Sequence, residues 1–117
     1  MTDQEYWDCK EVFYKTLLDY VKAFNERMAE RFKRDTVSKY AIVAAARAEY
    51  IYGYSQHLDL NDLKVSELNS DFWQKYRYQH LYGWDQRDAY KRLKAFVLFL
   101  ENEGHCPKGT AAKVKVW

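Results

Sequence analysis

The sequence has few of the residues that interrupt helices. It contains one proline and four glycines in 117 residues, and no Gly/Ser-rich linker, internal repeat or low-complexity tract. Proline and glycine are among the commonest residues at turns and helix ends, so their scarcity favours long helices joined by short connections. We expect a single all-α domain over residues 1–117, since a chain of this length is long enough to bury its own core.

Cysteines and long apolar runs are also scarce. The two cysteines, Cys9 and Cys106, are too few and too far apart for a disulfide framework, and the N-terminus has no apolar signal segment. The longest apolar run near a possible span, AFVLFL at 95–100, is far shorter than the roughly 20 residues needed to cross a bilayer. These features predict a protein of the reducing cytoplasm without a transmembrane helix.

Neither sign of charge predominates over the whole chain, but the charges are unevenly placed. The formal net charge is +2; residues 1–35 carry seven basic and eight acidic side chains (−1), residues 36–69 three and four (−1), and residues 70–117 nine and five (+4). A locally positive surface attracts polyanions. The C-terminal third is therefore the part expected to bind one.

The sequence contains 48% hydrophobic residues, and their spacing predicts a long first helix over about 4–32, capped by Thr2 or Asp3. Its apolar side, at intervals of three and four, comprises Phe13, Leu17, Val21, Phe24, Met28 and Phe32. Its solvent side comprises Lys10, Glu11, Lys15, Asp19, Lys22, Glu26 and Glu30. The apolar side could cover the rest of the domain, which is the usual outcome, or pair with a second copy.

A second helix is predicted over 36–57, capped by Asp35, Thr36 or Ser38. It is rich in alanine, and small side chains let neighbouring helices approach closely. This helix is therefore expected to lie at the centre of the bundle.

Two further helices are predicted over about 70–82 and 86–103, closed by Gly83 and Gly104. Residues 105–117 follow as an extended exit segment or tail. The expected fold is a compact bundle of four main helices with a long N-terminal helix.

The last of these helices has the clearest pattern, and Asp85 can cap its start. Its predicted buried side comprises Ala89, Tyr90, Leu93, Phe96, Val97 and Leu100. Arg87, Lys91 and Lys94 follow one another at intervals of four and three beside that stripe. A cationic edge of this kind suits nucleic acid, although a solvated face without a ligand gives the same pattern.

Residues from Leu60 to about Lys113 resemble the N-terminal core-binding domain of tyrosine recombinases, which is SAM-like and of the phage-integrase type. In that family a leucine-rich connection precedes a helix that ends in a short polar turn. The next helix carries an apolar repeat, ends in a glycine and is followed by a proline-containing exit, here Gly104 and Pro107. With 36–57 as the upstream helix, the resemblance spans roughly residues 36–113.

The resemblance implies a DNA-binding module that holds duplex phosphates with a basic helical hairpin. The residues expected to contact phosphates are Lys75, Arg77, Arg87, Lys91 and Lys94. Arg77 is also placed to reach a base edge. Recombinase catalysis requires a separate domain with a nucleophilic tyrosine, so this chain is not expected to be an enzyme.

The remaining motifs predict no cofactor or metal. Histidines and cysteines are scattered without CxxC or HxxxH spacing, and the glycines form no phosphate-binding loop. The competing class is a small helical adaptor, or an inhibitor encoded by a mobile element, that binds a protein through aromatic side chains such as Trp7, Trp73, Tyr78 and Trp84. Self-association through the first helix is a third possibility.

Overall fold

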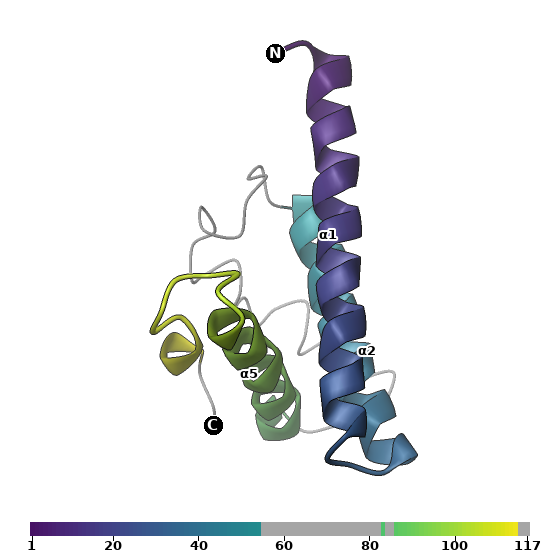
Figure 1. Ribbon diagram of the computed structural model, residues 1–117, viewed down its shortest axis with the longest axis vertical. Coiled ribbons are helices and arrows are strands. Elements are labelled where there is room, and N and C mark those ends of the chain that lie inside the picture. Colours follow the sequence, from purple (N-terminus) through teal and green to yellow (C-terminus); the bar gives the residue numbers. More distant parts are fainter. Residues whose placement is uncertain (55–82, 84–85, 115–117) are drawn as a thin grey trace.

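The computed structural model describes residues 1–54, 83 and 86–114. These residues form α1 (Asp3–Ala29), α2 (Arg34–Tyr54), α5 (Gln86–Asn102) and η2, a short 3-10 helix (Ala111–Lys113) (Figure 1). Strands are absent from the ranges just given, so the all-α prediction is confirmed for them. The predicted helix over 70–82 lies outside the described residues.

The helix α1 begins as the sequence predicts. The Thr2 hydroxyl accepts a hydrogen bond from the Glu5 backbone N–H at 3.2 Å and so caps the first turn. The prediction for Lys10 was wrong: it lies on the buried side, 2% exposed, with its Nζ 6.0 Å from the centre of the Tyr52 ring. The physical reason is its position three residues before Phe13, which places it in line with the apolar side.

The end of α1 differs from the prediction. The helix stops at Ala29, and the chain turns over residues 30–33 instead of continuing to residue 32. Phe32, predicted to be buried, is 38% exposed because the helix has ended before it, and its ring stacks on Tyr40 with centroids 5.5 Å apart.

The helix α2 starts earlier than predicted. The carbonyl of Lys33 accepts the Val37 N–H at 3.0 Å, so the helical hydrogen bonds already begin there. Asp35 and Ser38 therefore lie inside the first turns and are not caps; Ser38 Oγ donates to the Arg34 carbonyl at 3.1 Å. Thr36, the third candidate cap, also lies inside the first turn of α2 and is not a cap. The predicted end at residue 57 lies outside the described residues.

The helix α5 ends in the glycine-dependent turn that the sequence predicts. Gly104 has a φ of +77°, the Gly104 N–H donates to the Glu101 carbonyl at 3.0 Å, and the His105 N–H donates to the Leu100 carbonyl at 2.8 Å. This pair of bonds is a Schellman motif. The predicted cap at Asp85 lies outside the described residues.

The helices α1 and α2 run antiparallel along the long axis of the molecule, and α5 packs against them (Figure 1). Phe24 of α1 lies at the centre of the core, with its ring centroid 5.2 Å from that of Phe96 and 5.6 Å from that of Phe99. Ala44 and Ala48 of α2 are fully buried in the same cluster. These two small side chains therefore lie in the core and permit close approach, as predicted, whereas Ala45 is exposed.

We predicted an extended exit segment or tail over 105–117. Between His105 and Val114 the chain turns and forms η2, and the Ala111 N–H donates to Glu101 Oε1 at 3.0 Å. The side chains that this segment buries are Cys106, Thr110, Ala111 and Val114.

Candidate nucleic-acid interface

The cationic edge of α5 lies beside a fully buried stripe. All six predicted core residues of this helix are buried: Ala89, Tyr90, Leu93, Phe96, Val97 and Leu100. Arg87 and Lys91 are exposed, and Lys94 is half-buried. The intervals of four and three that separate these cations keep them on one side of the helix. The core thus fixes the direction in which this edge faces.

Lys91 and Lys94 differ from their neighbours in being available for a ligand. Arg87, Asp88 and Arg92 each interact with other groups, whereas no carboxylate of the described residues lies within ion-pair distance of Lys91 or Lys94. The ammonium group of a lysine without a protein counter-ion is hydrated by water, which it can exchange for a phosphate oxygen. These two side chains are therefore the best-placed phosphate ligands on α5.

Two of the predicted phosphate ligands, Lys75 and Arg77, lie outside the described residues. Their role stays a prediction, and so does the convergence of the whole basic hairpin on one surface.

A second group of cations, to which the sequence alone gave no function, lies at the turn between α1 and α2. Residues 26–39 carry five basic and three acidic side chains, giving +2, whereas residues 1–11 carry one and four, giving −3. Lys33, Arg34 and Lys39 are exposed and lack ion pairs in the described part of the chain. Summing charge over each end of the first helix, instead of over thirds of the chain, would have revealed this polarity.

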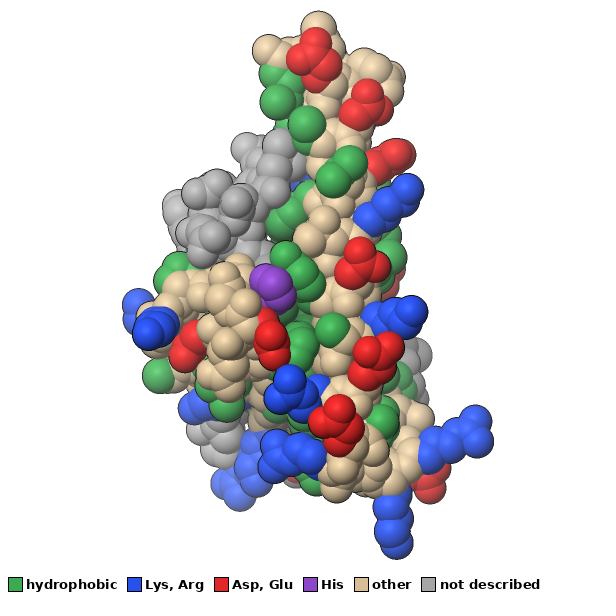
Figure 2. All heavy atoms as spheres, in the orientation of Figure 1, with side chains coloured by type: hydrophobic (Ala, Val, Ile, Leu, Met, Phe, Trp, Pro, Cys, Tyr) green, Lys and Arg blue, Asp and Glu red, His purple; other side chains and the backbone are tan. Residues whose placement is uncertain are grey.

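Both cationic groups lie toward the same end of the molecule. The first turn of α5 and the α1–α2 turn are at the lower end of the long axis in Figure 1. Figure 2 shows Lys and Arg side chains gathered toward this end, while acidic side chains predominate near the start of α1. The described surface is therefore electrostatically polar along its length.

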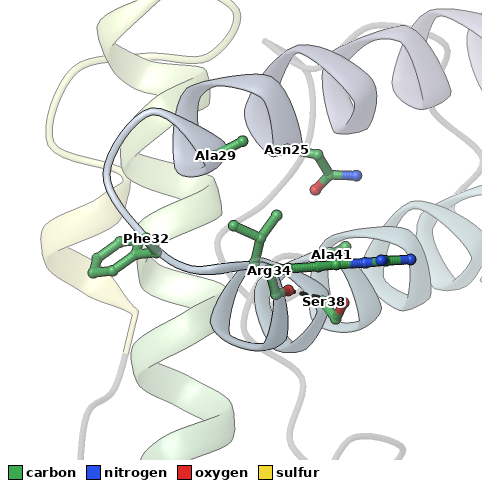
Figure 3. A pocket seen from close by; sticks show the side chains of 7 residues that line it. Asn25, Ala29, Phe32, Arg34, Ser38 and Ala41 are labelled. Carbon is green, nitrogen blue, oxygen red and sulfur yellow. Dashed lines mark hydrogen bonds between the residues drawn. The ribbon is translucent and has the colours of Figure 1, made fainter.

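A hollow of about 400 Å³ lies between the end of α1 and the first turns of α2 (Figure 3). Its lining is formed by Asn25, Ala29, Phe32, Arg34, Val37, Ser38 and Ala41. Asn25 points into the space between the two helices, and its Oδ1 is buried without a hydrogen-bond donor among the residues that the structure describes. A buried acceptor without a partner costs about 1–3 kcal/mol. The hollow thus combines apolar walls with an oxygen that requires a donor.

The C-terminal segment holds a buried thiol. Burial raises the pKa of Cys106, a hydrogen bond with Thr110 lowers it in part, and the negative charge of Glu101 raises it. A protonated, buried thiol is a poor nucleophile and a poor metal ligand. Among the residues that the structure describes, no three His, Cys, Asp or Glu side chains are grouped so as to hold a metal ion.

No helix in the described ranges combines the length and the apolar character needed to cross a membrane. A scan against protein-family models and searches of curated proteins and solved structures found no match. The resemblance to recombinase core-binding domains is therefore supported only as far as a small all-helical domain.

Proposed function

We propose that this chain binds duplex DNA through the phosphate backbone, using the cationic edge of α5. One observation carries the proposal: Lys91 and Lys94 project from a helix anchored by its opposite side in the core, and in the part of the chain that the structure describes neither forms an ion pair with a carboxylate. Rigid placement lowers the entropic cost of binding a phosphate. Lys75, Arg77 and Arg87 belong to the same proposed surface.

The cations of the α1–α2 turn extend this proposal. Lys33, Arg34 and Lys39 lie toward the end of the molecule where α5 begins, so a duplex lying across that end meets both groups. Contacts of this kind fix the orientation of DNA and carry little sequence information. The proposed activity is therefore phosphate binding with weak sequence preference.

The finer form of the proposal is a non-catalytic core-binding module of a phage or mobile-element tyrosine recombinase. Catalysis would then reside in a domain outside this chain. A cytoplasmic setting belongs to the same proposal, and the two cysteines, neither of which forms a disulfide, favour it.

The test is fluorescence anisotropy of a labelled duplex titrated with the full chain at several salt concentrations. We expect the logarithm of the binding constant to fall linearly with the logarithm of salt, at about 0.9 per phosphate contacted. Replacing Lys91 and Lys94 together by glutamine should weaken binding and reduce this slope by about two.

Lys15→Gln is the matched control, because Lys15 is exposed on α1 and lies outside the proposed surface. It should leave both affinity and slope unchanged apart from the small effect of net charge. An absence of binding at low salt, or an equal loss with Lys15→Gln, contradicts the proposal.

A protein-binding adaptor or inhibitor is the second candidate, favoured by the exposure of large apolar side chains. Trp7 is 55% exposed and Leu18 is 40% exposed, and aromatic side chains are common anchors of protein interfaces. Trp73, Tyr78 and Trp84 lie outside the described residues. Binding through such a surface should change little with salt, which separates this candidate from the first.

A further inference from the structure

The hollow at the end of α1 has specific chemical requirements. Its walls are largely apolar, and the buried Asn25 Oδ1 needs one hydrogen-bond donor. Its volume of about 400 Å³ is in the range of sites that hold small ligands or large side chains. A flat apolar group with a single N–H meets these requirements, and the indole of tryptophan is such a group.

An indole of this kind is exposed at the opposite end of the same helix. Trp7 lies in the second turn of α1, its ring packs edge-on against Tyr6 with centroids 5.4 Å apart, and it is 55% exposed. Its Nε1–H can only donate, and no acceptor lies within hydrogen-bond distance in the described structure. Trp7 and Asn25 therefore have complementary requirements that one molecule does not satisfy by itself.

The helical repeat relates these two residues. Trp7 and Asn25 are 18 residues apart, which is five full turns, so both lie on the same side of α1 about 27 Å apart. Two copies of α1 packed antiparallel about a two-fold axis near Thr16 place each Trp7 on the Asn25 of the other copy. Such an arrangement is isologous and closes on itself.

The residues between these two ends fit the same register. Glu11, Leu18 and Lys22 are exposed and lie at helical intervals on the side of α1 that carries Trp7. In the antiparallel pair, Leu18 meets the half-buried Tyr14 of the other copy, and Glu11 meets Lys22. The excess of carboxylates at the start of one helix also faces the cationic turn at the end of the other.

We propose that this chain pairs with a second copy of itself through antiparallel packing of α1. The Trp7 indole of each copy occupies the hollow of the other and donates its Nε1–H to Asn25 Oδ1. This inference uses none of the proposed phosphate ligands on α5, but Arg34 of the cationic α1–α2 turn lines the hollow, so the two proposals share that residue.

The primary test is sedimentation equilibrium of the full chain over a concentration series. The expected mass is twice 14.1 kDa, about 28 kDa. Trp7→Ala should weaken the dimer at least about 10-fold, as expected for an aromatic anchor. Val12→Ala, on the same helix, removes a side chain that is 65% exposed on another side and should leave the mass unchanged.

A charge exchange tests the register. Glu11→Lys and Lys22→Glu should each weaken the dimer, because each creates two pairs of like charges across the interface. The double variant restores both pairs and should regain the dimer mass. Three results would overturn the proposal. The first is a monomeric chain, which would leave the hollow to water or a small molecule. The others are a dimer that Trp7→Ala leaves intact and a double variant that associates no more than the single variants do.

Discussion

The ring of His105 lies flat on the ring of Tyr20, with centroids 3.8 Å apart and an angle of 15° between the planes. Tyr20 belongs to α1, whereas His105 follows directly after the turn that ends α5. The contact therefore attaches the start of the C-terminal segment to the longest helix of the fold.

His105→Ala should lower the free energy of unfolding by about 1 kcal/mol, because it removes a stacked aromatic pair. Urea unfolding followed by circular dichroism measures this loss. Lys108→Ala, an exposed position in the same segment, should change the stability by less than about 0.5 kcal/mol. Equal effects of the two substitutions would show that the stack contributes nothing.

Two Gly→Ala substitutions should have opposite signs. Gly104 has a φ of +77°, a conformation in which a side chain is strained, so Gly104→Ala should destabilise the fold by about 1–2 kcal/mol. Gly53 lies inside α2 with no atom within 4 Å of an added Cβ, so Gly53→Ala should stabilise it by about 0.4–1 kcal/mol. Thermal unfolding of both variants gives the comparison, and two shifts of the same sign would contradict it.

Phe24→Ala should be among the most damaging substitutions, with a loss of about 3–5 kcal/mol, because Phe24 is fully buried among aromatic rings of α2 and α5. Phe32→Ala is the matched control, since it removes the same side chain from an exposed position. The urea concentration at the midpoint of unfolding should be clearly higher for Phe32→Ala than for Phe24→Ala. Should Phe24→Ala not fold, Phe24→Leu should show the same ranking with a smaller loss.

Stability should fall at alkaline pH partly through Cys106. Burial holds its pKa above the ordinary value, so the folded chain keeps the thiol proton to a higher pH than the unfolded chain does. The stability that the buried, protonated Cys106 thiol contributes is fully present below its ordinary pKa and is lost as pH rises through its pKa in the folded chain. Above about pH 9, the free energy of unfolding should therefore fall more steeply for the unsubstituted chain than for Cys106→Ala. Parallel pH profiles for the two proteins would contradict this.

Several parts of the fold that depend on local sequence were predicted correctly, whereas the caps of α2 and the end of α1 were not. The buried side of α5, the cap at Thr2 and the turn at Gly104 each follow from residues within one or two helical turns of one another. Their cause is backbone hydrogen bonding and helical periodicity, which a short stretch of sequence already contains.

Two of the predictions that failed, those for Lys10 and Phe32, depend on contacts between distant segments. Lys10 is buried in a setting that includes Tyr52, more than forty positions further along the chain. Phe32 does not lie on the apolar side of α1, because the chain turns toward α2 before it and its ring stacks on Tyr40. Charge and hydrophobicity at a single position could not indicate either outcome.

The candidate site likewise has one part that the sequence predicted and one part that only the packing of the helices revealed. Sequence spacing alone placed Arg87, Lys91 and Lys94 beside a buried stripe, because three and four residues make one turn of any α-helix. The hollow around Asn25 required the packing of α1 on α2 to be known.

The sequence by itself determined that the described chain is helical, which sides of α1 and α5 are largely apolar, and where α5 stops, since these properties arise from interactions between near neighbours. Only the tertiary structure decided which lysines keep their charge exposed and which polar groups are buried without a partner. The physical reason is that desolvation depends on atoms brought together from separate helices, and no single helix contains that information.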